Sequence, residues 1–213
     1  MVMHKISNFK WVPKDSAVGT VFNALQPAIR YTKEDCLDLP AMVYVKREVE
    51  LTKQQKKYYA ELKSRMIMQA AGEEITAVNA AANMNKLLQI SCGAVYTDKG
   101  DTLEFDIRHR YKVLREVIDE SSKKVLVFAP FKHAISILSE KLTSDGVSNA
   151  VIQGSVSAGK RTEIFKAFQE QDEPRVLVIQ PAAAAHGVTL TAANTVVWWG
   201  PTSSLETYAQ ANA

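Results

Sequence analysis

Short apolar runs alternate with longer amphipathic stretches through the second half of the chain. The apolar runs predict strands, and the stretches between them place apolar residues at helical spacing. In chain order the predicted elements are a helix at 109–120, a strand at 124–129, a helix at 132–143, a strand at 150–152, a helix at 158–169, strands at 175–179 and 195–199, and a last helix. This alternation predicts an α/β fold, a parallel sheet with helices on both faces.

The first half of the chain has a different texture. Residues 1–40 show weak periodicity and predict an extended or partly helical lead-in. Residues 43–51 alternate apolar and polar positions, which predicts a half-buried strand. Thr52 to Gln55 fits a capping box that opens a helix through about Met68.

Two further elements follow before the sheet region. A second helix is predicted from about Glu74 to Ile90, after the break at Gly72. Residues 94–105 predict a small β-hairpin whose turn contains the sequence Asp-Lys-Gly-Asp. The first half is therefore mainly helical.

Composition narrows the class of protein. With 213 residues and 46% hydrophobic residues, the chain can bury the core of one large domain, alone or with a smaller annex. No apolar run approaches the roughly 20 residues of a membrane span, and no secretory signal is visible. Cys36 and Cys92 match no metal-ligand spacing and favour reduced thiols, so we expect a cytoplasmic protein with no membrane contact and no metal site. The net charge of +3 permits a polyanionic partner without requiring one.

In parallel sheets, ligands bind at the carboxyl ends of the strands, so the following loops are the places to look for chemistry. Gly154 to Lys160 has the spacing of a phosphate-binding P-loop between a strand and a helix. The position that should hold magnesium through Ser or Thr is Arg161, and no later strand ends in an acidic residue. A Gly-Ser turn in which Ser157 caps the next helix is favoured over the P-loop.

The loop after Ile179 allows two interpretations. Pro181 cannot donate to a sheet ladder, so the strand ends before it. The alanines at 182–185 and Gly187 either let the backbone approach a phosphate closely or form a helical turn packed on the sheet. His186 has no nucleophile and orienting carboxylate nearby in the sequence, which argues against acid–base catalysis.

Aromatic and basic residues give weaker signals. Trp198 and Trp199 can stack on bases, although packing of at least one in the core is favoured. Basic residues between 46 and 65, and again between 108 and 115, are compatible with DNA phosphate contact or with solvated helix faces. Glutamates at 48, 50 and 61 dilute the first group.

Together these segments resemble the Swi/Snf family of superfamily-two helicase-like ATPases, in a phage-like form. Residues 29–40 resemble the "RRTKEDVLxxLP" bridge between the two motor lobes of that family. The other segments that carry the resemblance are 43–59 ("VELTxxQxxxY"), 85–92 ("LLxLRQICxHP", without its histidine and proline), 124–131 (motif IV), 153–168 ("DGSTSxxxRxxxIxxF"), 187–195 (motif V, "GLNLTAANT") and 208–213 (the start of motif VI, "QxxxRxxRxGQ").

The resemblance implies an ATP-driven translocase or remodeller of duplex DNA. ATP and magnesium would lie between two RecA-like lobes, and the P-loop and D-E-x-H motif of the first lobe do not occur in this sequence. The implied domains are an inter-lobe linker at 1–40, an associated strand, helical segment and hairpin at 41–108, and the RecA-like C-terminal lobe at 109–213. The partners would be duplex DNA and the N-terminal lobe of the same protein.

The resemblance also implies site residues. The DNA backbone would be contacted by residues after three strands and in motif V: Lys132, His133, Gly154, Ser155, Arg161, Gln180, Pro181, Ala182, Ala183 and Thr191. Gly187 and Gln210 would face the nucleotide cleft. The catalytic arginines of motif VI would lie beyond Ala213, so we expect negligible ATPase activity and no bound cofactor for this chain alone.

Departures from the family pattern leave alternatives open. Ala184 and Ala185 replace paired glycines, Gln180-Pro181 replaces a Ser-Thr pair, and Thr189 replaces an asparagine. The start of motif V therefore offers no hydroxyl for a contact to phosphate. The competing functions are a catalytically inert nucleic-acid-binding or interaction module with a degenerate motor fold, and a self-contained P-loop phosphotransferase.

Overall fold

A computed structural model describes residues 2–29, 42–72, 77–97, 100–184 and 190–212. The chain divides into two compact units, Met1–Lys46 and Arg47–Ala213, and each is described by itself. The division of the chain into three regions at 40/41 and 108/109 remains a prediction.

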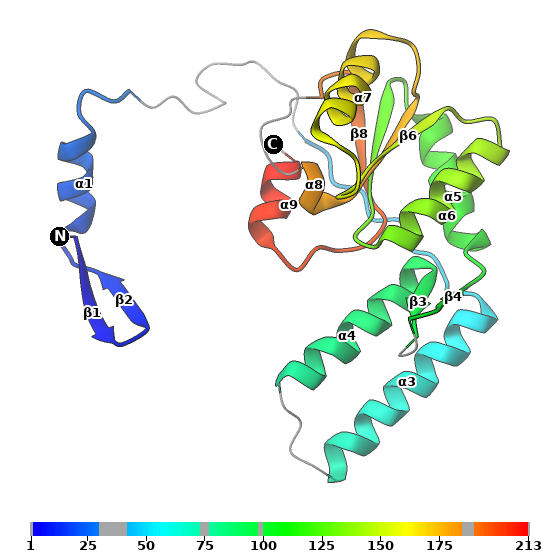
Figure 1. The fold of residues 1–213 in the computed structure, drawn as a ribbon, viewed down its shortest axis with the longest axis horizontal. Coiled ribbons are helices and arrows are strands. Elements are labelled where there is room, and N and C mark those ends of the chain that lie inside the picture. The colour runs from blue at the N-terminus through cyan, green and yellow to red at the C-terminus, as the bar shows by residue number, and fades with distance from the viewer. Residues whose placement is uncertain (1, 30–41, 73–76, 98–99, 185–189, 213) are drawn as a thin grey trace. The chain divides into compact units, whose positions relative to one another are not determined.

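The larger unit is built on a four-stranded parallel sheet. Its strands are β5 (Lys124–Phe128), β6 (Asn149–Ile152), β7 (Val176–Ile179) and β8 (Ala193–Trp198). Their order in the sheet is β6-β7-β5-β8, and every neighbouring pair is parallel (Figure 1). The four predicted strands are confirmed, each with ends within two residues of the prediction.

Helices cover both faces of this sheet, as predicted. The helices are α5 (Arg108–Glu120), α6 (Lys132–Ser144), α7 (Ala158–Glu170), α8 (Pro181–Ala184) and α9 (Leu205–Ala211). Val125 and Val127 join one buried cluster with residues of α5 and α6, while Leu126 and Phe128 join a second cluster with Phe168 of α7 and residues of α8 and α9. Because successive side chains of a strand point to opposite faces, a continuous apolar run is required to fill both clusters.

A pair of long helices and a hairpin project from the sheet region (Figure 1). These elements are α3 (Lys53–Gly72), α4 (Ala77–Cys92), β3 (Ala94–Tyr96) and β4 (Thr102–Glu104), and β3 and β4 pair antiparallel. We call residues 53–104 the arm. Both predicted helices and the predicted hairpin are confirmed, although the middle of its turn, 98–99, lies outside the described residues.

The capping box at the start of α3 is formed as predicted. The Gln55 backbone N–H donates to Thr52 Oγ1 at 3.5 Å, and the Thr52 backbone N–H donates to Gln55 Oε1 at 3.2 Å. Both side chains are buried. The sequence signal was sufficient here because the two contacts are local, three residues apart.

The predicted strand at 43–51 is wrong. Residues 42–52 are extended but pair with no strand, and Val43 and Val45 are 79% and 69% exposed. A strand needs a neighbour for its backbone groups and a surface to cover its apolar face. Alternation in the sequence supplies neither.

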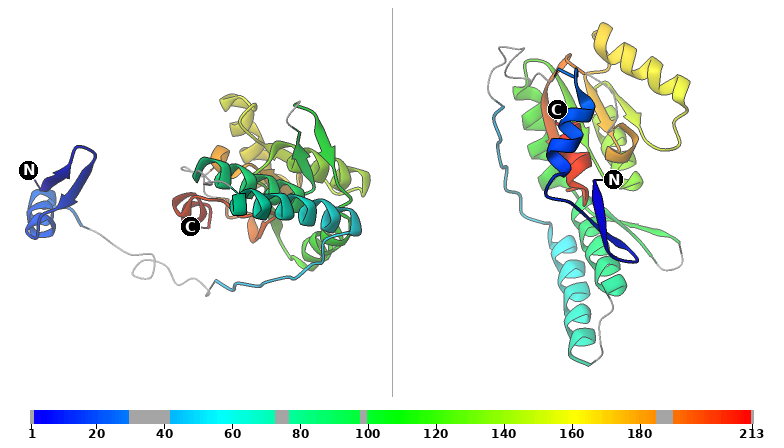
Figure 2. Two further views of the ribbon diagram at one scale, coloured as in Figure 1. Left: turned by 90° about the horizontal axis from the view of Figure 1, so that it is seen from below. Right: turned by 90° about the vertical axis from the view of Figure 1, so that its left-hand side faces the viewer.

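The smaller unit consists of a hairpin and one helix, which Figure 2 shows from two further sides. Strands β1 (Met3–Ser7) and β2 (Lys10–Pro13) pair antiparallel, and α1 spans Ala17–Leu25. The sequence predicted an extended or partly helical lead-in and missed the hairpin. Among residues 2–29 only Ala17 is buried, so the described part of this unit has no apolar core of its own.

Candidate nucleic-acid interface

The carboxyl ends of the four strands form one edge of the sheet, because all four strands are parallel. We call it the carboxyl edge. Lys132 and His133 follow β5, Gly154 and Ser155 follow β6, and Gln180 follows β7 directly. The structure therefore brings five of the predicted DNA-contact residues to this one edge.

Two of the loops at the carboxyl edge are joined by a side chain. Gln180 Oε1 accepts a hydrogen bond of 3.2 Å from the Gly154 backbone N–H. Gln180 replaces the hydroxyl residue of the family pattern, and its amide now fixes the loop after β6. Since its carbonyl oxygen is engaged by Gly154, the –NH₂ group of the same amide is the part that can donate to a ligand.

The Arg161 side chain holds the same loops through hydrogen bonds to their backbone carbonyls. Its guanidinium donates to the carbonyl oxygens of Val156 at 2.9 Å, Gln153 at 3.3 Å and Ala183 at 3.4 Å, with a further contact to Gly154 O at 3.4 Å. A guanidinium bound to several carbonyls fixes backbone geometry. Arg161 is thus a positioning residue for the loops, and its direct contact with DNA remains a prediction.

The P-loop interpretation of 154–160 does not fit the geometry. Ser157 Oγ caps α7 by accepting from the Lys160 backbone N–H at 3.4 Å, which confirms the favoured Gly-Ser turn. The Lys160 ammonium pairs with Glu163 at 2.9 Å, and the Arg161 guanidinium binds the carbonyls of the loop. A P-loop instead directs backbone N–H groups and its lysine toward phosphates.

The alanine segment after β7 forms a helical turn. Pro181–Ala184 is α8, in which Pro181 is buried and Ala182 is exposed. Ala183 packs against the apolar cluster that contains Phe128 and Phe168. The helical-turn interpretation is therefore confirmed for these four residues, and contact of Pro181, Ala182 and Ala183 with DNA remains a prediction.

His133 and Lys132 differ in what surrounds them. His133 Nε2 lies 2.7 Å from Thr102 Oγ1, and its ring meets Tyr96 edge-to-face at 5.1 Å. The imidazole thereby docks the β3–β4 hairpin against the start of α6. Lys132 is exposed at the same edge. The sequence could not reveal the histidine contact, because its partners lie more than 30 residues away.

The remaining predicted site residues lie elsewhere. Thr191 precedes β8, at the opposite, amino edge of the sheet, where Gln169 Nε2 donates to it at 3.1 Å. Gln210 lies exposed on α9 and donates to Glu206 Oε1 at 3.2 Å. Gly187 lies outside the described residues. Thr191 is therefore separated from the carboxyl edge.

A buried contact that the sequence did not reveal joins the arm to the end of β8. The Arg110 guanidinium lies 4.5 Å from the centre of the Trp199 ring and donates to the carbonyls of Trp199 and, at 2.7 Å, Ser91. Trp199 Nε1 donates to Cys92 O at 2.9 Å, and Trp199 is only 2% exposed. This confirms the prediction that at least one of the two tryptophans packs in the core.

Burial of the Arg110 and Cys92 side chains changes their pKa values. It lowers the pKa of the Arg110 guanidinium and raises the pKa of the Cys92 thiol. A Cβ at Gly200 would lie 2.6 Å from Cys92 Sγ, so the turn after β8 approaches α4 closely. The thiol is a packed, protonated group and not a nucleophile.

Trp198 lies on the opposite face and fixes α9. Its ring stacks on Phe128 at 4.7 Å and meets Tyr208 of α9 at 5.0 Å. Its indole N–H donates to Asn212 Oδ1 at 3.3 Å. The helix predicted to face the nucleotide cleft is therefore held to the sheet by this tryptophan.

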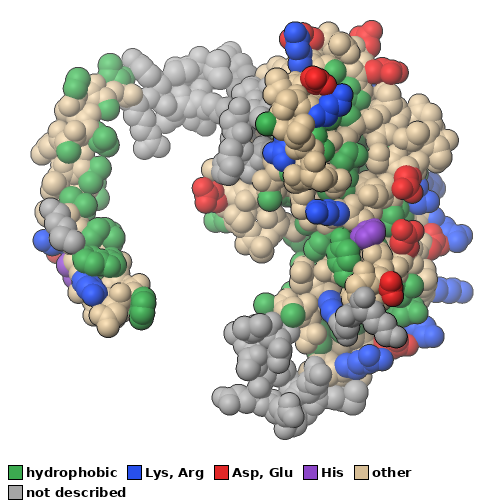
Figure 3. All heavy atoms as spheres, in the orientation of Figure 1, with side chains coloured by type: hydrophobic (Ala, Val, Ile, Leu, Met, Phe, Trp, Pro, Cys, Tyr) green, Lys and Arg blue, Asp and Glu red, His purple; other side chains and the backbone are tan. Residues whose placement is uncertain are grey.

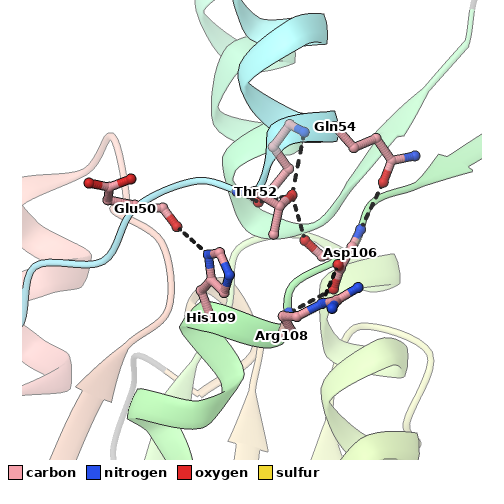
Figure 4. Close-up of polar contacts among 7 residues, drawn as sticks. Glu50, Thr52, Gln54, Asp106, Arg108 and His109 are labelled. Carbon is pink, nitrogen blue, oxygen red and sulfur yellow. Dashed lines mark hydrogen bonds and ion pairs between the residues drawn. The ribbon is translucent and has the colours of Figure 1, made fainter.

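Polar contacts hold the base of the arm against α5 (Figure 4). Thr52 Oγ1 donates to Asp106 O at 3.0 Å, and Gln54 Oε1 accepts from the Asp106 N–H at 3.1 Å. The Asp106 carboxylate accepts from the Arg108 backbone N–H at 3.0 Å and pairs with its guanidinium at 2.6 Å. The hydrogen bond from the Arg108 backbone N–H lowers the pKa of the Asp106 carboxyl most, and the Arg108 guanidinium lowers it further.

The described residues hold neither a metal centre nor a membrane-spanning helix. Within the described ranges, no three His, Cys, Asp or Glu side chains are grouped so that they could hold a metal ion. No helix in the part of the chain that the structure describes is long and apolar enough to cross a membrane.

The sheet region is similar to a known protein family. Residues 109–213 match the family model of the helicase conserved C-terminal domain. Over 179 residues the chain is 25% identical to an uncharacterized ATP-dependent helicase of Mycoplasma genitalium, covering 80% of this chain and 17% of that protein. The chain thus spans about a sixth of the length of this relative.

Solved structures agree in fold. The SWI2/SNF2 ATPase core domain of Sulfolobus solfataricus matches with a TM-score of 0.67 at 20% identity, covering 93% of this chain and 43% of that one. The C-terminal domain of the same kind of ATPase from that organism matches with a TM-score of 0.56 at 21% identity, covering 70% of this chain and 68% of that one. Residues 109–213 are therefore a helicase conserved C-terminal domain, and the chain has the fold of the C-terminal RecA-like lobe of SWI2/SNF2 ATPases.

Proposed function

We propose that this chain is the C-terminal motor lobe of a DNA-dependent ATPase that translocates on duplex DNA. It holds the DNA backbone at the carboxyl edge and completes an ATP site formed with an N-terminal RecA-like lobe. The observation that carries the proposal is the arrangement of that edge in a helicase C-terminal domain: Gln180 and Arg161 fix the loops after β6 and β7 beside the exposed Lys132.

The edge suits a phosphate backbone chemically. Lys132 supplies a cation, and the –NH₂ group of Gln180 supplies a neutral donor beside the backbone of Gly154. Contacts of this kind fix the position of a protein on the duplex without reading its sequence. In this proposal Ser155, Pro181, Ala182 and Ala183 line the same track, and Thr191, at the opposite edge of the sheet, lies outside it.

The described residues do not by themselves fit ATP and magnesium. They contain no group of three metal-ligating side chains, the Lys160 ammonium pairs with Glu163, and Ser157 caps α7. The nucleotide and its metal would therefore be held mainly by the other lobe. ATP supplies the phosphoryl-transfer chemistry, while Gly187 and Gln210 of this chain would line the cleft.

The small unit supports the proposal of a second lobe. Its hairpin and helix expose Phe9 (99%), Val18 (80%), Phe22 (63%) and Trp11 (45%). Large apolar side chains exposed in one small unit are typical of a surface that another protein surface covers. In this proposal the N-terminal lobe covers them, and the predicted inter-lobe linker at 1–40 packs against that lobe.

ATP hydrolysis, with and without duplex DNA, tests the proposal. The assay compares this chain with a parent protein that carries both lobes. We expect DNA-stimulated hydrolysis by the parent and negligible hydrolysis by this chain alone, because an arginine finger contributes about 10³–10⁵ in rate. Lys132→Gln combined with Gln180→Ala in the parent should reduce the stimulation by DNA, while Lys112→Gln should not.

Other outcomes point to the competing functions. DNA binding without hydrolysis in the parent would favour an inert module with a degenerate motor fold. The opposite outcome is that this chain alone hydrolyses ATP and loses that activity in Lys160→Ala. Such a result would contradict the helix-cap interpretation of Ser157 and favour the P-loop phosphotransferase.

A further inference from the structure

Helix α3 carries a stripe of basic side chains. Lys53, Lys56, Lys57 and Lys63 fall within about a third of its circumference at 100° per residue. All four are exposed. On the other side of α3, Gln55 is buried and Leu62 half-buried (both within the part that packs on α4). We call the four lysines the α3 stripe.

The stripe is only partly neutralised. Lys56 pairs with Glu50 at 2.7 Å. No carboxylate of the described residues pairs with Lys53, Lys57 or Lys63, and Glu61 is the one acidic residue in the sequence from 53 to 67. Figure 3 shows Lys and Arg side chains over α3 at the lower right of the molecule. Of the glutamates at 48, 50 and 61 that dilute this basic group in the sequence, Glu50 thus offsets one lysine of the stripe, Lys56.

The base of the arm is fixed to the carboxyl edge. His133, at the start of α6, contacts Thr102 of the hairpin, and Trp199, after β8, donates to Cys92 at the end of α4. The Gln55 side chain donates to Ile90 O at 2.9 Å, so the first turn of α3 lies beside the same end of α4. The stripe therefore starts near the carboxyl edge and continues along the arm.

We propose that the α3 stripe is a second binding site for the phosphate backbone of duplex DNA. The inference rests on the proposed function and extends its track beyond the sheet. Lys53 and Lys63 are separated by about 15 Å along the helix axis. Duplex DNA carries about one negative charge per 1.7 Å when both strands are counted, so a duplex of this length carries roughly nine phosphates, of which those on the near side face the stripe.

Ammonium groups on long stems suit this task. They bind phosphates as point charges without fixed geometry, which permits movement along the backbone. Phosphate contacts release counterions, so the stripe should contribute a salt-dependent and sequence-independent part of the affinity. A stripe that is merely solvated would contribute no such part.

The test is the affinity of the 213-residue chain for a short labelled DNA duplex, measured by fluorescence anisotropy between about 50 and 200 mM salt. The stripe variant is Lys53→Gln, Lys57→Gln and Lys63→Gln together. The matched control is Lys112→Gln, Lys123→Gln and Lys166→Gln, which removes the same charge from exposed sites elsewhere. Circular dichroism checks that each variant folds.

We expect the stripe variant to bind on the order of tenfold more weakly, and its salt slope to fall by about 0.9 for each phosphate that it no longer neutralises. The charge control should retain most of the affinity and the slope. Equal losses of affinity in the two variants would overturn the proposal, because net charge alone would then explain the effect.

A third variant separates this inference from the proposed function. Lys132→Gln with Gln180→Ala removes contacts at the carboxyl edge only. If that variant weakens binding and the stripe variant does not, the stripe proposal fails and the edge contact stands. If only the stripe variant weakens binding, the edge contact fails and the stripe stands. No measurable binding of the unaltered chain would overturn both, as would unchanged binding in both variants.

Discussion

The two compact units of the chain use apolar residues in opposite ways. In Arg47–Ala213, the strands β5 and β7 lie between two helical layers, and Val125, Val127 and Leu177 are 0% exposed. In residues 2–29, Phe9 is 99% exposed and only Ala17 is buried. Apolar content alone does not produce a core. A core requires elements whose apolar faces meet, and a single hairpin with one short helix does not provide enough of them.

The same substitution in the two units sharpens the comparison most. Phe168→Ala should lower the free energy of unfolding by about 3–5 kcal/mol, because the ring is 0% exposed and its loss leaves a cavity. Phe9→Ala should change it by less than about 0.5 kcal/mol. Denaturant unfolding followed by circular dichroism measures both.

The milder Phe168→Leu keeps most of the volume and serves where the alanine variant does not fold. A comparable loss of stability in Phe9→Ala would break the comparison, since the ring would then be covered in this chain. In the two-lobe parent, by contrast, Phe9→Ala should become destabilising.

The second prediction concerns the contact between the arm and the sheet. Arg110→Met keeps the aliphatic stem but leaves the carbonyls of Ser91 and Trp199 without their donor. We expect stability to fall by about 2 kcal/mol, because these carbonyls lose charge-assisted hydrogen bonds. The control is Arg108→Met, whose side chain is 75% exposed and should matter far less. Thermal unfolding compares the two variants. Equal shifts of the unfolding midpoint would mean that the Arg110 guanidinium does not stabilise the contact between the arm and the sheet.

The smallest effect is expected at the base of the arm. The Arg108 contacts lower the pKa of Asp106, so its stabilising contribution is present above the unfolded pKa of about 3.9 and is lost as pH falls through the folded value. Asp106→Asn should therefore be slightly less stable than the unaltered chain at pH 7, and the difference should shrink below about pH 4. The midpoint of thermal unfolding at several pH values checks this, and a gap that widens in acid contradicts it.

The central strands of the sheet, β5 and β7, were predictable because each must fill two apolar layers. A strand that is buried on both faces must be an uninterrupted apolar run, such as Val125 to Phe128, and such a run is visible in the sequence. The position of the carboxyl edge then follows because the predicted strands are parallel. The capping box of Thr52 and Gln55 was predictable because it is local. The strand at 43–51 was wrong because alternation does not tell whether a neighbouring strand exists.

The contacts that organise the site were not predictable from the sequence. His133 meets Thr102, and Arg110 meets Trp199, only after segments up to 89 residues apart are brought together. Arg161 fell on the arginine of the family motif, but its use as a clamp on loop carbonyls is a tertiary property. The residue types at these positions gave no local signal of their roles.

Arg110 and Trp199 contact Ser91 and Cys92, and these contacts bear on where a fragment for expression should begin. Similarity to the helicase C-terminal domain begins at residue 109, whereas the compact unit begins at Arg47. A piece that starts at 109 would lack the acceptors of the Trp199 indole and of one Arg110 amine, and would expose the face that α4 covers. The stretch that the family model matches is therefore shorter than the compact unit, and we expect a stable expressed fragment to begin at or before Arg47.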